Sequence, residues 1–239
     1  MQPDEMSHQA MGYDRTSIMF SPDGRLLQVE YAKKTVKQGT TVIGVVFKNG
    51  VLLVTDKRVV EKLMVGKSLE KIYQVDDHIG ATASGILSDG RILIERAQVV
   101  AQQHRITYDE PISPEALVKD LCNLKQLYTQ VGGARPFGVS VMIIGIDDHP
   151  HLYVTDPTGI FFEYKATAIG EADTQVKDIL NKEYKETMGL DEAARLALGA
   201  LKKALGKEFS LDRVDGAYLL QQDKKFTRLS HEEISRLSK

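Results

Sequence analysis

The side chains best suited to hold a metal ion lie between Asp147 and His151, in a stretch that reads Asp-Asp-His-Pro-His. Carboxylate oxygens and imidazole nitrogens are ligands that Zn²⁺ accepts in proteins. The stretch falls between two expected strands, and Pro150 separates His149 from His151, so the spacing differs from that of common zinc sites. We interpret the stretch as an exposed turn and expect no metal site.

Two other positions could carry chemistry, and each has a simpler interpretation. Cys122 is the only cysteine, which excludes an internal disulfide and is typical of a reducing cytoplasm. It lies beside Leu121 and Leu124, so a buried, inert thiol is expected rather than a nucleophile. Gly132-Gly133 is interpreted as a backbone bend, because no helix start follows it to hold a phosphate. The sequence has no P-loop, GxSxG elbow or paired-cysteine zinc pattern, and we expect no cofactor.

The 239 residues carry a formal net charge of -2, which gives no bulk attraction to nucleic acid or to an anionic membrane. No apolar run approaches the ~20 residues needed to span a bilayer. The polar N-terminus, with Asp4 and Glu5, is unlike a secretion signal. Hydrophobic residues make up 42%, which suits one domain with a sizeable core. We expect a cytoplasmic protein with no membrane or nucleic-acid partner.

Helical patterns are recognised by the period of their apolar residues. The first follows the turn Ser21-Pro22-Asp23-Gly24 and ends at Gly39. Ser113 is an expected N-cap, followed by a proline and an acid, and a short charged helix starts at Ser230. The positions expected on one face of each helix are Leu26, Val29, Ala32 and Val36; Ile92, Arg96, Val99 and Val100 of a helix over 89–105; Leu117, Leu121, Leu124 and Tyr128; Val176, Ile179, Leu180 and Tyr184; and Ala193, Ala197, Ala200, Leu201 and Ala204 of a helix that ends at Gly206.

Strand patterns come in blocks between the helices. Lys48-Asn49-Gly50 is a hairpin signal between two apolar runs, and near-continuous apolar strands are typical of burial on both faces. The order strands, two helices, strands, two helices, strands implies two stacked sheets between helical layers, an α+β arrangement rather than alternating βαβ units. The expected strands cover residues 41–47, 51–55, 72–75, 79–84, 139–146, 152–154, 160–163, 166–169, 216–220 and 226–229.

An ordered series of motifs resembles the family of proteasome α-type subunits. One tripeptide would match by chance, whereas this series covers the chain almost from end to end. The resemblance implies the four-layer αββα sandwich of the N-terminal-nucleophile hydrolases, with an extra N-terminal helix. The motifs are Tyr13-Asp14-Arg15, Phe20 to Leu26, Gln28 to Ala32, Gly39 to Gly44, Asp56-Lys57-Arg58, Glu70-Lys71-Ile72, Thr82 to Gly85, Tyr128-Thr129-Gln130, Gly132 to Gly138 and Glu163 to Gly170.

The resemblance also implies a function. A proteasome α subunit is a structural and gating component of the core particle: seven copies form an outer ring that controls substrate entry, and proteolysis takes place on β subunits inside. The expected partners are other α subunits, β subunits and a proteasome-activating ATPase, whose C-terminal tails dock on the ring in ATP-dependent protein degradation. The short C-terminal tail favours an archaeal ring of one α type. The single domain, 1–239, is expected to comprise a mobile gating segment (1–22), a helix (24–37), the sandwich (40–229) and a C-terminal helix (230–239).

The alternative is a catalytic β-type threonine peptidase, processed at Gly39-Thr40. Catalytic relatives cut a Gly-Thr bond, and the freed amine and a nearby lysine activate the threonine hydroxyl. Aligning Asp56 with the active-site aspartate places Thr40 at the nucleophile position but Ile72 where the lysine belongs, and isoleucine cannot carry a proton. Lys71 is adjacent, but neighbouring strand residues point to opposite faces. We therefore expect no catalytic residue in this chain.

Matched positions also give the expected gate and pore. Two phenols, a carboxylate and a stiff proline can lock a reverse turn through a few hydrogen bonds. The set that matches the cluster holding the gate open is Tyr13, Asp14, Pro22 and Tyr31. The set that matches the pore constriction is Val131, Gly132 and Gly133. Relatives often carry an aromatic residue in place of Val131, so an altered pore lining is expected.

A third matched set is the pocket between subunits that receives the tail of the activator. It comprises Gly39, Lys71 and Ile86. Lysine supplies a counter-charge for a terminal carboxylate, and glycine allows backbones to approach closely. Ile86 stands where relatives carry leucine, which is a mild change.

Overall fold

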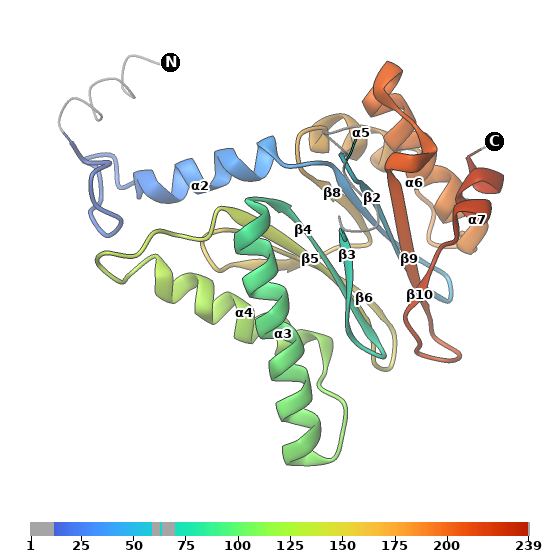
Figure 1. Ribbon diagram of the computed structural model, residues 1–239, viewed down its shortest axis with the longest axis horizontal. Coiled ribbons are helices and arrows are strands. Elements are labelled where there is room, and N and C mark those ends of the chain that lie inside the picture. Colours follow the sequence, from blue (N-terminus) through green and yellow to red (C-terminus); the bar gives the residue numbers. More distant parts are fainter. Residues whose placement is uncertain (1–11, 59–62, 64–69, 239) are drawn as a thin grey trace.

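The computed structural model describes residues 12–58, 63 and 70–238 (Figure 1). Two antiparallel five-stranded sheets are present, with strand orders β10-β9-β2-β1-β8 and β3-β4-β5-β6-β7. This confirms the α+β architecture expected from the block order of the sequence. The strands are β1 (Val42–Phe47), β2 (Gly50–Asp56), β3 (Ile72–Asp76), β4 (Ile79–Gly85), β5 (Val139–Ile146), β6 (Pro150–Thr155), β7 (Phe161–Glu163), β8 (Ala166–Ile169), β9 (Val214–Leu220) and β10 (Thr227–Arg228).

Helices form the outer layers (Figure 1). One pair, α5 and α6, packs on the first sheet, and the pair α3 and α4 packs on the second. The N-terminal helix α2 contacts β4 and β5, and α7 packs against α6. The helices are α2 (Leu27–Gln38), α3 (Leu87–Tyr108), α4 (Pro114–Tyr128), α5 (Asp173–Glu183), α6 (Leu190–Leu205) and α7 (His231–Leu237), with short 3-10 turns at Gly206–Glu208 and Leu211–Arg213.

Strands β1, β2 and β5 are buried on both faces, which explains their continuous apolar sequences. In β1, Ile43 and Val45 pack toward α5 and α6, whereas Val42 belongs to the core between the two sheets. Every residue of β2 and of β5 is buried. The sheets approach so closely at Gly44 that an added Cβ would lie 2.5 Å from Leu152 Cδ1. Each fully buried aliphatic side chain contributes about 1.5–3 kcal/mol, so the two-sided core is the main source of stability.

Local capping signals in the sequence are confirmed by the hydrogen bonds that they make. Ser113 Oγ accepts from the backbone N–H of Ala116 at 3.2 Å, directly before the proline that starts α4. Ser230 and Glu233 form a reciprocal capping box at the start of α7. Such a cap stabilises a helix by typically about 1 kcal/mol, so these two starts are specified by neighbouring residues.

The buried face of α3 is not the expected one. Ile92 and Val99 are 45% and 49% exposed, and of the expected positions it is Val100 that packs against the core. The small residues explain the difference, because they let the helix lie close to the sheet: an added Cβ at Gly90 would be 3.0 Å from Ala83 Cβ. The residues of α3 that are buried are Asp89, Gly90, Leu93, Ile94, Ala97 and Ala101.

Candidate functional site

Thr40 lies inside a continuous chain between α2 and β1. The N–H of Gly39 donates to Val36 O at 3.1 Å, and Gly39 O accepts from the N–H of Glu171 at 2.9 Å. Thr40 O accepts from Ser84 Oγ at 2.9 Å. In the unprocessed chain the nitrogen of Thr40 is a peptide amide that follows α2, and a peptide amide cannot act as the free α-amine that an N-terminal nucleophile needs.

Asp56 forms a buried ion pair with Arg213. Its side chain is buried, and both oxygens accept from Arg213, at 3.0 Å from Nε and 2.9 Å from Nη2. These hydrogen bonds raise the pKa of Arg213, so the guanidinium holds its charge. Ile72 is fully buried in the core between the sheets. Isoleucine at this position supplies no proton acceptor.

Lys71 is almost completely buried, with 5% of its surface exposed. Its ammonium donates to Ala83 O at 2.9 Å. Burial lowers the pKa of Lys71 to about 8, and the carboxylate of Asp56 partly opposes this shift. Lys71 is therefore a cation that is held out of water and is easily discharged, unlike a surface lysine.

Lys71 lies at a small pocket that also contains Ile86. The pocket is bordered by Gly85, whose backbone lies very close to Gly39. A Cβ added at Gly39 would lie 2.2 Å from Gly85 N. The structure thus brings Gly39, Lys71 and Ile86 into one region, where the end of β4 meets the start of α3. Glycine is needed at position 39 because any side chain would collide with that backbone.

The expected gate residues surround the start of α2. Tyr31 of α2 donates its hydroxyl to Asp14 Oδ2 at 3.4 Å, and Gln28 Nε2 donates to Asp14 O at 2.5 Å. Tyr13 is partly buried beside this contact, while Pro22 is exposed in the turn that precedes the helix. Asp14 is thus joined to α2 through its side chain and its carbonyl group. Residues 1–11 of the expected gating segment lie outside the described residues.

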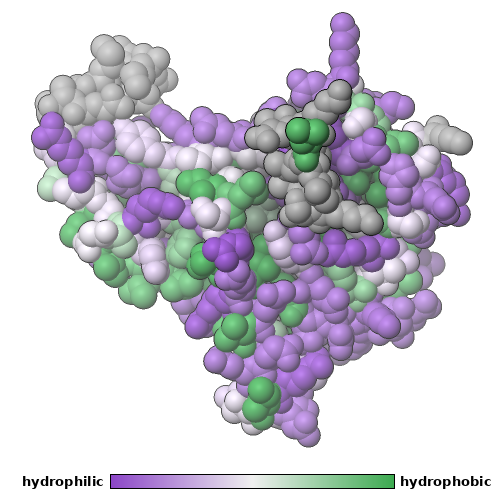
Figure 2. Space-filling model, viewed as in Figure 1, coloured by the Kyte–Doolittle hydropathy of each residue, from purple (hydrophilic) through white to green (hydrophobic). Residues whose placement is uncertain are grey.

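The expected pore residues follow α4 directly, next to the same N-terminal segment. Val131 is 44% exposed, and its carbonyl accepts from Ser17 Oγ at 3.4 Å. A hollow of about 330 Å³ is lined by residues 15–18 on one side and 132–135 on the other. Figure 2 shows hydrophobic side chains on the left of the molecule, below α2 and over the end of α4. The N-terminal segment at residues 15–18 and the loop that carries the pore set, far apart in sequence, are therefore neighbours in the fold.

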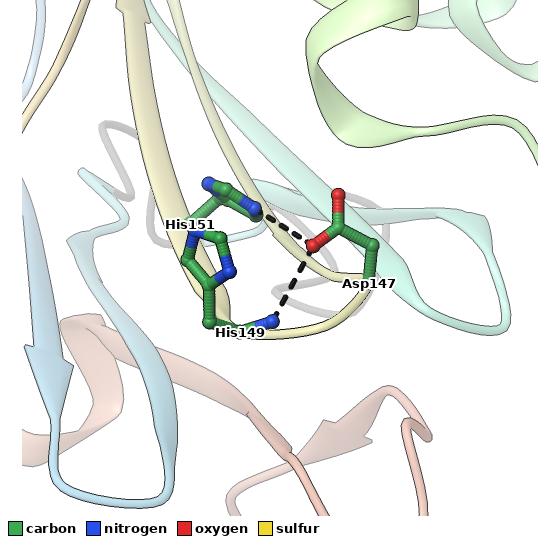
Figure 3. A group of neighbouring side chains, drawn as sticks. All are labelled: Asp147, His149 and His151. Carbon is green, nitrogen blue, oxygen red and sulfur yellow. Dashed lines mark hydrogen bonds and ion pairs between the residues drawn. The ribbon is translucent and has the colours of Figure 1, made fainter.

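Asp147 and His149 lie on the turn between β5 and β6, as expected, but His151 is a buried residue of β6. Figure 3 shows the carboxylate of Asp147 facing the ring of His151, with the ring of His149 beside it. Burial opposes the charged imidazole, but hydrogen bonds to Glu163 and Asp147 raise the pKa of His151 above its ordinary value. The expectation of an exposed turn is therefore wrong for this histidine, because it ignored the contact with Glu163 on β7.

Cys122 is buried, as the sequence indicated, and burial raises the pKa of its thiol to about 11. A thiol with this pKa is almost entirely protonated at neutral pH, so it is not a reactive nucleophile. Within the described part of the chain, no helix is both long and apolar enough to cross a membrane.

Comparison with known proteins assigns this arrangement to one family. Residues 36–219 match the family model for proteasome subunits, and residues 13–34 match the model for the N-terminal signature of A-type proteasome subunits. The proteasome alpha subunit of Archaeoglobus fulgidus is 48% identical over 94% of this chain and 91% of its own length. The corresponding proteins of Methanosarcina barkeri and Pyrococcus abyssi are each 48% identical over 94% of this chain, and over 90% and 86% of their own lengths.

Proposed function

The chain belongs to the family of proteasome α subunits, and on this premise we propose that it forms a ring that gates substrate entry and docks an activator. An α subunit is the non-catalytic outer-ring component of the core particle in protein degradation, and it assembles with other α subunits and with β subunits. The catalytic threonines are on the β subunits. The observation that carries the proposal is the helix α2, which packs on β4 and β5 and lies largely within the part of the chain that matches the N-terminal signature of A-type subunits.

A closed ring of seven identical α subunits is the assembly that we propose for this chain in the cytoplasm. Head-to-tail contacts close such a ring, and they require two different surfaces on each protomer. One suitable surface is a groove of about 380 Å³ between α2 and the edge strand β7, lined by Lys33, Lys37, Phe162 and Tyr164. Phe162 is 54% exposed, and exposed aromatic residues at a sheet edge are suited to burial against a neighbouring protomer.

The gate in this proposal is the segment that precedes α2. It is supported by the contact between Asp14 and Tyr31 and by the position of residues 15–18 over the loop at Val131. The docking pocket is the region of Gly39, Lys71 and Ile86, which would take the C-terminal tail of a proteasome-activating ATPase. A buried ammonium beside a pocket is suited to a terminal carboxylate, because the attraction of that anion offsets the hydration energy that the ammonium loses on burial.

Native mass spectrometry tests the assembly. The purified chain is expected to form a seven-membered ring and, together with β subunits, a larger particle in which every α copy retains the residues before Thr40. A stable monomer in the presence of a suitable β partner would contradict the proposal. Phe162→Asp should weaken ring formation if the groove is an interface, whereas Lys207→Asp, an exposed change after α6, serves as the matched control.

A further inference from the structure

Two side chains of the turn between β5 and β6 and one side chain of β6 converge away from the gate, the pore and the docking pocket. Asp147, His149 and His151 each offer one oxygen or nitrogen, and these ligand atoms lie within 4.8 Å of one another. His151 Nε2 is 2.9 Å from Asp147 Oδ1, and the ring centroids of the two histidines are 4.2 Å apart. In Figure 3 all three side chains surround the same small space.

The cluster is held in place by groups that surround it. Two backbone N–H groups, those of Asp148 and His149, donate to Asp147 Oδ1 at 2.5 and 3.4 Å and fix the carboxylate. On the far side of the buried ring, His151 Nδ1 is 2.5 Å from Glu163 Oε1, which comes from β7. Tyr153 is a further partner of this nitrogen, with its hydroxyl at 3.2 Å.

The contact with Glu163 selects which nitrogen of His151 is available. Nδ1 donates its proton to Glu163, so an ion would bind at Nε2, beside His149, and would replace the proton that Nε2 shares with Asp147. A histidine that donates one ring N–H to a carboxylate and presents the other nitrogen to an ion is the usual support of metal-bound imidazole. A spacing that looked wrong for a metal in the sequence therefore becomes suitable once the two strands are folded into a hairpin.

We propose that Asp147, His149 and His151 bind a divalent transition-metal ion of the Zn²⁺ class, with Glu163 as the positioning residue. Two imidazoles and one carboxylate suit Zn²⁺, and three protein ligands leave a fourth position for water. Ligand atoms at ~2.0–2.1 Å from a tetrahedral ion lie about 3.3 Å apart. Asp147 and His151 are already near that spacing, and the exposed ring of His149 closes the site by a change of rotamer.

The bound ion would tie the β5–β6 turn to β7. Its ligands come from the turn and from β6, and the outer carboxylate comes from the next strand, so occupancy joins two hairpins of the second sheet. Binding to the folded state alone raises its stability in proportion to occupancy. The site is thus a stabilising element, and it needs no part in proteolysis.

Titration of the untagged, assembled ring with ZnCl₂ against a chromophoric chelator tests the proposal. One tight site per protomer is expected, with a rise in melting temperature, and Co²⁺ in place of Zn²⁺ should give the intense visible absorption of a tetrahedral site. His149→Ala removes an exposed ligand without disturbing the core and should abolish the tight site. His104→Ala, on α3, removes a histidine elsewhere and should leave it unchanged.

Glu163→Gln keeps the side-chain shape and all three ligands but removes the outer carboxylate, so a loss of about 10- to 100-fold in Zn²⁺ affinity is expected. A structural role alone would not link this exposed position to metal affinity. Absence of a tight site in the wild-type ring would overturn the proposal. Equal affinity of the wild-type and His149→Ala rings would overturn it as well.

Discussion

Replacement of Lys71 by alanine is expected to abolish the stimulation of peptide hydrolysis by an activator tail while ring assembly is retained. The ammonium of Lys71 would meet the terminal carboxylate of the tail in a charge-assisted hydrogen bond at a partly desolvated position. Such a bond contributes about 1.5–3 kcal/mol, or roughly ten- to a hundred-fold in affinity per tail. In the proposed assembly several tails would dock on one ring, so the loss would be multiplied through avidity. Titration of a synthetic tail peptide against the assembled particle measures it.

Further variants and a modified peptide distinguish the effect of the Lys71 charge from the effect of its buried aliphatic stem. Lys71→Met keeps most of the buried aliphatic stem and should behave as Lys71→Ala does, whereas Lys207→Ala changes an exposed lysine and should respond as the wild type does. A tail peptide with an amidated C-terminus should be inactive on the wild-type particle, because it lacks the carboxylate. Equal stimulation curves for wild type and Lys71→Ala would make Lys71 a structural residue with no part in docking.

The same pocket should respond to pH. The pKa of Lys71 is lowered to about 8 by burial, so its charge is present below that pH and is lost as the pH rises through it. A docked carboxylate favours the charged form and moves the transition upward. Stimulation by the tail is therefore expected to decline above about pH 8 in the wild type. Lys71→Ala, which the tail is not expected to stimulate, gives the baseline rate at each pH.

Deletion of residues 1–12 is expected to raise the rate of peptide hydrolysis by the assembled particle. If the open gate is a minor state populated at about 0.1–10%, removing the closed state raises an entry-limited rate by about ten-fold or more. The deletion leaves Asp14, Tyr31 and α2 in place, so assembly should continue. Steady-state hydrolysis of a fluorogenic peptide by matched particles, with and without the deletion, gives the comparison.

Two controls belong with the deletion. Native mass spectrometry establishes that both particles contain the same number of α and β subunits. A very short peptide should show a smaller increase than a longer one, because entry limits it less. An unchanged rate for all peptides in fully assembled particles would show that the N-terminal segment is not the gate.

The elements of this fold could be predicted from the sequence because their signals are local. The Ser113 N-cap and the apolar runs of β1, β2 and β5 depend on neighbouring residues alone. The two-sided burial of these strands also follows from their composition, since a strand without polar alternation has no face to present to water. The arrangement of two sheets between helical layers followed from the block order.

The face of α3 could not be selected in the same way. Two sets of apolar residues in α3, on adjacent faces of the helix, both have the spacing of an amphipathic helix, and the period alone does not show which set is buried. The structure buries the face with small residues such as Ala97 and Ala101, which allow close packing on the sheet, and exposes Ile92. Only the shape of the opposing surface decides this choice.

Contacts between distant segments could not be predicted from the sequence either. The partner of Asp56 is Arg213, 157 residues away, and no local pattern marks that arginine. Lys125 reads as a polar residue of α4, yet it is fully buried and donates to Val139 O and Thr155 Oγ1, each at 2.9 Å. A buried cation is acceptable only with such partners, and the fold alone supplies them.

The central claim, that this chain shapes and gates the particle but does not cut peptides, is tested most directly at Thr40. Particles assembled from Thr40→Ala chains and wild-type β subunits are expected to hydrolyse peptides at the wild-type rate, and the purified chain alone should have no peptidase activity. The intact mass of the wild-type chain should include the residues before Thr40. A mass that begins at Thr40, with activity that the substitution abolishes, would contradict the account.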